Sequence, residues 1–137
     1  MSTQTRVGGL QGALPPLLLP IRPMAASDGQ NARKHPMARH RRASAWWGGL
    51  ATAAAVAGWP CALPWPRAVV TITCIARRGK EMDDDNLAGC CKAVRDAIAK
   101  WFDCGDAPGG PVSWRYRWER GPDGTRIELT EEATDGS

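Results

Sequence analysis

Long apolar runs are missing from this sequence of 137 residues. The longest apolar stretch, residues 48–59, is well short of the roughly 20 residues that a helix needs to cross a bilayer, which excludes a membrane span. Residues 1–23 contain several leucines but are interrupted by Pro15 and Pro16, which is unlike the apolar segment of a signal peptide. We therefore expect a cytoplasmic protein.

The sequence also lacks any C-x-x-C pair, and its number of cysteines is odd. This argues against both the disulfide framework of a small secreted protein and a zinc ribbon. Two of the cysteines are adjacent in a segment with helical apolar periodicity, where thiols are more often small core side chains than metal ligands. We expect a structural role for all five: Cys61, Cys74, Cys90, Cys91 and Cys104.

Acidic residues are almost absent from the first 80 positions, which hold eleven Lys and Arg against Asp28 alone. The remaining positions hold seven Lys and Arg against thirteen Asp and Glu. A basic region together with an acidic one suits a protein that holds a polyanion and binds a divalent cation nearby. A solvated surface whose charges are segregated along the chain would give the same composition. Charge alone therefore leaves both interpretations open.

Hydrophobic periodicity predicts a single small α/β (α+β) domain over residues 17–130, preceded by a flexible leader (1–16) and followed by a disordered tail (131–137). The clearest strand is β-branched and alternating, and the clearest helix has apolar residues at spacings of three and four. A polar, basic segment without hydrophobic period is expected to be a loop. The expected order is an edge strand (17–21), the basic loop (27–42), a helix (43–57), a strand (67–76) and a helix (87–102).

The C-terminal part alternates apolar and polar residues over 112–119, then turns at G-P-D-G (121–124) into residues 125–130. This pattern predicts a β-hairpin. The expected fold is thus a mixed β-sheet packed against two helices, with a C-terminal β-hairpin.

The most informative segment is K-E-M-D-D-D-N-L (80–87), where the predicted strand leads into the predicted helix. If the backbone is extended here, Asp83 and Asp85 project to the same side. Two carboxylates about 4 Å apart repel by roughly 4 kcal/mol at an effective dielectric near 20, and a hard cation such as Mg²⁺ removes that repulsion. The alternative is an acidic helix N-terminus whose charges point apart into solvent.

Further candidates follow along the same helix. Lys92 lies seven residues after Asp85, nearly two full turns, and so on the same face of a continuous helix. The turn W-F-D-C-G-D beyond the helix carries Asp103 and Asp106, either of which could bring a third carboxylate to the first two.

The string D-x-D-N-L at Asp83–Leu87, the helix K-A-V-R-D-A-I at Lys92–Ile98 and the acidic turn together resemble the RusA family of Holliday-junction resolvases, which are small dimeric Mg²⁺-dependent endonucleases. The resemblance implies that Asp83, Asp85 and Asp106 are metal ligands, with Asp103 as the alternative third ligand, and that Lys92 is the catalytic lysine. The family's lysine commonly comes four residues after the second Asp, where this chain has Gly89.

The chemistry that the resemblance implies is Mg²⁺-dependent hydrolysis of phosphodiesters in branched DNA, by a homodimer whose two sites cut a four-way junction symmetrically. A set of basic residues is expected to bind DNA phosphates without reading sequence. This set is Arg33, Lys34, Arg39, Arg41 and Arg42.

Trp46 and Trp47 could stack on unpaired bases, although a tryptophan pair in an Ala-rich helix is more often core or dimer interface. The sequence also leaves two other functions open: a metal-dependent nuclease acting on flaps or other branched DNA, and a non-catalytic DNA-binding protein that uses only its basic loop.

Overall fold

The structure, a computed structural model, describes residues 12–20, 36–105 and 109–132, with side chains described throughout except at 36–43 and 84. The described elements are three helices and four strands. In chain order they are β1 (Leu17–Leu19), α2 (Pro36–Ala57), β2 (Ala68–Ala76), α3 (Asp84–Cys90), α4 (Lys92–Trp101), β3 (Val112–Arg120) and β4 (Gly124–Glu131).

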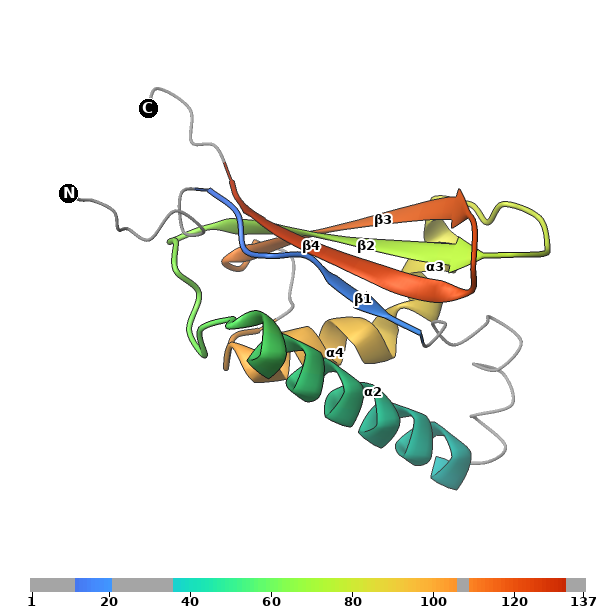
Figure 1. Ribbon diagram of the computed structural model, residues 1–137, viewed down its shortest axis with the longest axis horizontal. Helices are drawn as coiled ribbons and strands as arrows, with labels where there is room; N and C mark the ends of the chain where they lie inside the picture. The colour runs from blue at the N-terminus through green and yellow to red at the C-terminus, as the bar shows by residue number, and fades with distance from the viewer. Residues whose placement is uncertain (1–11, 21–35, 106–108, 133–137) are drawn as a thin grey trace.

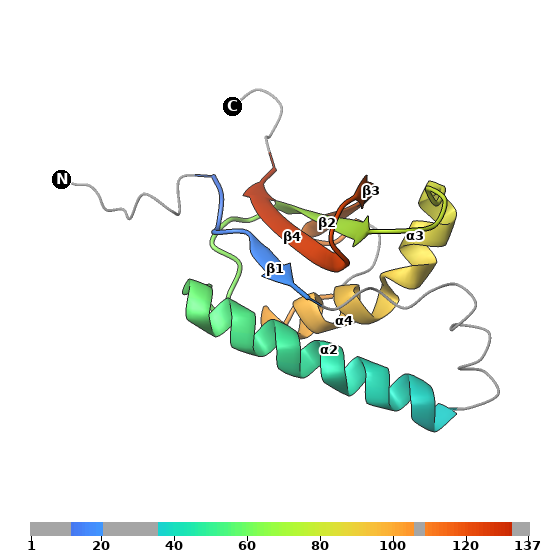
Figure 2. The same ribbon diagram turned by 45° about the vertical axis from the view of Figure 1, so that its right-hand side comes forward.

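The strands form one mixed sheet in the order β1-β4-β2-β3, and α2 and α4 cover one of its faces (Figures 1 and 2). This confirms the expected α+β domain with a mixed sheet packed against helices. None of the helices in the described ranges is long and apolar enough to cross a membrane.

β2 occupies a central position because it is largely buried on both faces. Val70 and Ile72 are fully buried on the helix side, and Thr73 and Ile75 on the other side are 1% and 6% exposed. A strand buried on both faces is stable only between two neighbours. β2 therefore pairs with β4 on one side and with β3 on the other.

The G-P-D-G turn reverses the chain as expected, so β3 and β4 run antiparallel, but they do not pair with each other because β2 lies between them. β3 pairs in parallel with β2, and β4 pairs antiparallel with β2. The connection passes over the end of β2, where the Gly121 N–H donates to the Ala76 carbonyl at 3.1 Å. The short connection predicted that the chain reverses direction. It did not predict that β2 would lie between β3 and β4.

α2 is longer than expected. The helix begins at Pro36, so residues 36–42, expected to be part of a loop, are helical. Proline is compatible with the first turn of a helix because its missing N–H has no partner there. The helix ends where expected, at Ala57, and Gly58 follows with φ of 80°. Trp46, Leu50 and Ala54 form its buried stripe at a spacing of four.

The N-terminal boundary also differs from expectation, because residues 12–16 are joined to the sheet. The Leu14 N–H donates to the Leu129 carbonyl at 3.0 Å, and the Leu14 side chain is only 5% exposed. The Trp59 indole N–H donates to the Pro15 carbonyl at 2.7 Å. The described fold therefore starts before residue 17, while residues 1–11 and 133–137 lie outside the described part of the chain.

Candidate functional site

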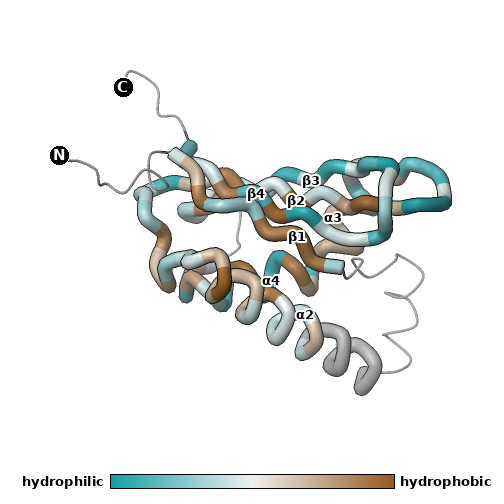
Figure 3. Tube along the Cα trace, in the orientation of Figure 1, coloured by the Kyte–Doolittle hydropathy of each residue, from teal (hydrophilic) through white to brown (hydrophobic). Residues whose placement is uncertain are grey.

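The candidate acidic site lies at the carboxyl end of β2, beside the end of the parallel strand β3. After Ala76 the chain passes through an exposed hydrophilic loop, visible in Figure 3 as the segment that leads into α3. This loop contains Arg77, Arg78 and Lys80, all exposed. Cations therefore precede the aspartates directly.

Residues from the β3–β4 connection hold this loop in place. The Arg120 guanidinium donates to the carbonyls of Arg77 and Gly79 at 3.0 and 2.8 Å, and it stacks on the Trp118 ring at 4.6 Å. The Arg77 N–H donates to Asp123 Oδ1 at 2.8 Å. Residues 77–79 are thus anchored before the chain reaches the aspartates. Sequence reasoning missed this role of Arg120 and Asp123, because their partners lie more than 40 positions away.

Asp83 is the N-cap of α3. Its backbone is extended, with φ −75° and ψ 170°, and its Oδ1 accepts the Asn86 N–H at 2.9 Å. Leu87, 2% exposed, anchors the first turn in the core. Because the backbone becomes helical at Asp84, the strand-type alternation expected to bring Asp83 and Asp85 to one side does not apply. The acidic N-cap interpretation is therefore correct for Asp83, whose second carboxylate oxygen accepts no hydrogen bond within the described part of the chain.

Asp85 is exposed in the first turn of α3, two positions from Asp83. Side chains two residues apart on a helix do not face each other, because they point roughly 160° apart around the axis. The two carboxylates each lie near the positive end of the helix, which favours negative charge. Within the residues whose side chains are described, no group of three or more His, Cys, Asp or Glu side chains could hold a metal ion. The described site thus has two exposed aspartates at the start of α3, after a loop that carries three exposed cations.

The helix expected over residues 87–102 is divided at Cys91, which has φ −91° and ψ 10°. α3 and α4 run in different directions (Figure 2). The bend buries two adjacent thiols, Cys90 at 2% and Cys91 at 0% exposed, whereas neighbours on one straight helix would point about 100° apart. Burial raises the pKa of the Cys91 thiol to about 12, as expected of a structural cysteine. Cys61, by contrast, is exposed.

Lys92 is the first residue of α4, after the bend. Its placement on the face of Asp85 was inferred from one continuous helix, and the structure divides that helix at Cys91. Its ammonium lies 3.3 Å from Asp96 Oδ2 in an exposed i,i+4 ion pair. Such a pair is weak and leaves the lysine free to exchange partners.

Asp103 lies at the opposite end of the β2–α3–α4–β3 unit from Asp83. It follows α4, close to the start of β3, whereas Asp83 follows β2 (Figure 1). α4 alone, with ten residues, spans about 15 Å. Within one chain the structure does not bring Asp103 to the first two aspartates. Asp106 lies outside the described residues.

The expected DNA-binding set is only partly within the described ranges. Arg33 and Lys34 lie outside them. Arg39, Arg41 and Arg42 belong to α2 rather than to a loop, and their side chains are not among those described. Trp46 is core, at 3% exposed, and Trp47 packs tilted against Trp101 with ring centroids 6.4 Å apart, so the expectation of a packing role is confirmed.

No family model matches this chain, and no curated protein matches it. The resemblance to the junction resolvases therefore rests on the residues of the motif alone.

Proposed function

We propose that the protein is a Mg²⁺-dependent endonuclease that hydrolyses phosphodiesters in branched DNA, with Holliday-junction resolution in recombination and repair as its principal activity. The observation that supports this is the exposed pair Asp83 and Asp85 at the carboxyl end of β2, next to a loop with three cations. Mg²⁺ is usually held by one or two protein carboxylates together with substrate phosphate and water. Two carboxylates beside phosphate-binding cations fit that requirement.

Each group has a role in this proposal. Asp83 and Asp85 hold the ion, and the N-cap bond to Asn86 orients the Asp83 carboxylate without using its second oxygen. Arg77, Arg78 and Lys80 bind phosphate oxygens of the substrate, and Lys92 offsets charge on the scissile phosphate after leaving Asp96. When bound, Mg²⁺ polarises the phosphate and activates water for attack.

A two-fold homodimer follows from the proposed substrate. Two symmetric cuts across a four-way junction require two sites related by the same axis as the DNA. The basic residues before and within the start of α2, Arg33 to Arg42, are proposed to hold the junction arms through their phosphates.

The test is cleavage of a labelled four-way junction with and without Mg²⁺. We expect Asp83→Asn and Asp85→Asn each to abolish cleavage while junction binding stays intact or tightens. Glu131→Gln, which removes an exposed carboxylate at the far end of β4, is the matched control and should leave cleavage unchanged. Full cleavage by either aspartate variant contradicts the proposal.

Two rival functions give different results in the same assay. A nuclease specific for flaps would cut a flap substrate faster than the junction and would still need both aspartates. A non-catalytic DNA-binding protein would bind every branched substrate, cut none, and be indifferent to Asp83→Asn.

A further inference from the structure

The face of the sheet opposite α2 and α4 has no helix over it in the described part of the chain (Figures 1 and 2). Register places three β3 side chains on this face: Arg115 opposite Thr71, Arg117 opposite Thr73, and Glu119 opposite Ile75. All three β3 residues are exposed. Alternate residues of a strand are about 6.8 Å apart, so the two arginines form a short row of positive charge.

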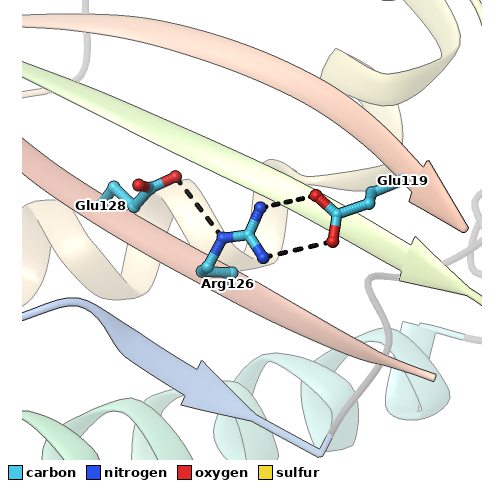
Figure 4. Close-up of polar contacts among 3 residues, drawn as sticks. All are labelled: Glu119, Arg126 and Glu128. Atoms are coloured by element: carbon cyan, nitrogen blue, oxygen red, sulfur yellow. Dashed lines mark hydrogen bonds and ion pairs between the residues drawn. The ribbon is translucent and has the colours of Figure 1, made fainter. Parts of the chain in front are cut away.

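The acids of this face are engaged by a different arginine. The Arg126 guanidinium contacts both carboxylate oxygens of Glu119, at 2.7 and 3.3 Å, and lies 3.5 Å from Glu128 (Figure 4). This contact lowers the pKa of Glu119 below its usual value. Arg126 draws the Glu119 carboxylate toward β4, although the charge of Arg117 also helps to lower the pKa of Glu119. Neither Arg115 nor Arg117 forms a hydrogen bond or a close ion pair among the described residues.

A pocket of about 420 Å³ lies at the same two arginines. It wraps around the edge strand β3 and is lined by Thr71, Trp114, Arg115, Tyr116 and Arg117. The buried Trp114 indole N–H has no hydrogen-bond acceptor in the described structure. Trp114 lies opposite Val70, on the side of the sheet that the helices cover, so this donor does not face the two arginines. The Tyr116 hydroxyl of the lining accepts a hydrogen bond from the Arg95 guanidinium at 2.7 Å. The groups of the lining that suit an oxyanion are therefore the two exposed guanidinium groups and the Thr71 hydroxyl, which share one side of the sheet.

We propose that this β3 pocket binds phosphates of the DNA backbone, as a second contact surface separate from Asp83 and Asp85. Planar guanidinium groups match phosphate oxygens in bidentate geometry. The contacts read no sequence and serve to position a DNA arm.

The inference rests on the proposed function only in the choice of DNA as ligand. Its test therefore avoids cleavage altogether, with binding of a labelled four-way junction measured by fluorescence anisotropy in EDTA over a series of salt concentrations. Arg117→Gln is compared with Lys100→Gln, which removes an equal charge from α4 on the other side of the sheet. The double variant Arg115→Gln/Arg117→Gln completes the set.

We expect Arg117→Gln to weaken junction binding about tenfold and Lys100→Gln to change it less than twofold. Each phosphate contact contributes about 0.9 to the slope of log K against log salt for duplex DNA, so the double variant should lose roughly 1.8 from that slope. Equal effects of Arg117→Gln and Lys100→Gln would overturn the inference, because net charge alone would then explain the binding.

The oligomeric state of each variant is measured by sedimentation in the same buffer. If the double variant loses DNA binding only because a dimer dissociates, the face is an interface between copies and the inference is wrong. Retained binding by both arginine variants, with cleavage by the native protein, would overturn the pocket alone and leave the nuclease proposal standing. Cleavage that survives Asp83→Asn would overturn the nuclease proposal and leave the pocket inference standing.

Discussion

The Arg120 guanidinium donates a 2.8 Å hydrogen bond to the carbonyl of Gly79, which has φ of 96°. One guanidinium thereby ties the connection between β3 and β4 to the loop that precedes the aspartates. The same group also bonds the Arg77 carbonyl, so the loop is held at two points. The geometry of the candidate site therefore depends on a residue of the neighbouring strand β3 that lies 41 positions from Gly79 in the sequence.

Replacing Arg120 with alanine should loosen this loop. We expect faster amide hydrogen exchange in residues 77–83, a loss of about 1 kcal/mol in the free energy of unfolding, and a higher Mg²⁺ concentration for half-maximal cleavage. Arg78→Ala, a matched change in the same exposed loop, should leave amide exchange unaltered. Exchange rates equal to those of the native protein would show that the two carbonyl bonds do not restrain the loop.

Asp83 combines a structural and a proposed catalytic role, and two substitutions separate them. Asparagine is as good an N-cap as aspartate, whereas alanine cannot accept the Asn86 N–H. Asp83→Ala should therefore lower stability by about 1 kcal/mol in urea unfolding, and Asp83→Asn by much less. Both should abolish cleavage, because neither supplies a carboxylate. A stable but inactive Asp83→Asn protein is the expected result, and equal destabilisation by both would contradict the capping role.

The role of Lys92 can be tested by moving the lysine. Gly89 is exposed in α3, and a Cβ added there meets no atom within 4 Å, so a lysine fits at the position where the resolvase family commonly carries it. We expect Lys92→Ala to slow junction cleavage about 100-fold and the added change Gly89→Lys to restore a large part of the rate. Gly89→Lys alone should stabilise α3 by up to about 1 kcal/mol. Unaltered cleavage by Lys92→Ala would remove the lysine from the mechanism.

Stability at low pH should report the contact between Glu119 and Arg126. Hydrogen bonding to Arg126 lowers the pKa of Glu119 from 4.5, so the contact stabilises the fold fully above that value and is lost as pH falls through the lowered pKa. Urea unfolding between about pH 3 and pH 6 should thus show a steeper loss of stability for the native protein than for Arg126→Gln. Parallel pH profiles for the two proteins would contradict this assignment.

The sequence was sufficient where the information is local. The alternation of residues 67–76 predicted β2 to within one residue, and the apolar spacing around Leu87, Val94 and Ile98 predicted a buried helical face that the structure retains. The acidic cap before Leu87 could also be recognised, because an N-cap depends on residues within one turn. The burial of Cys91 followed from the same periodicity, whereas the burial of its neighbour Cys90 depends on the bend.

Only the tertiary structure decided which strands pair, where the long helix bends and which groups share an edge. β2 separates β3 from β4 because burial on both faces favours a central strand, and this depends on the whole sheet rather than on the turn. The bend at Cys91 interrupts the helix from which the position of Lys92 was predicted, and the crossover carries Asp103 to the opposite end of the fold. Long-range packing energies set these features, and a local pattern of residues contains no information about them.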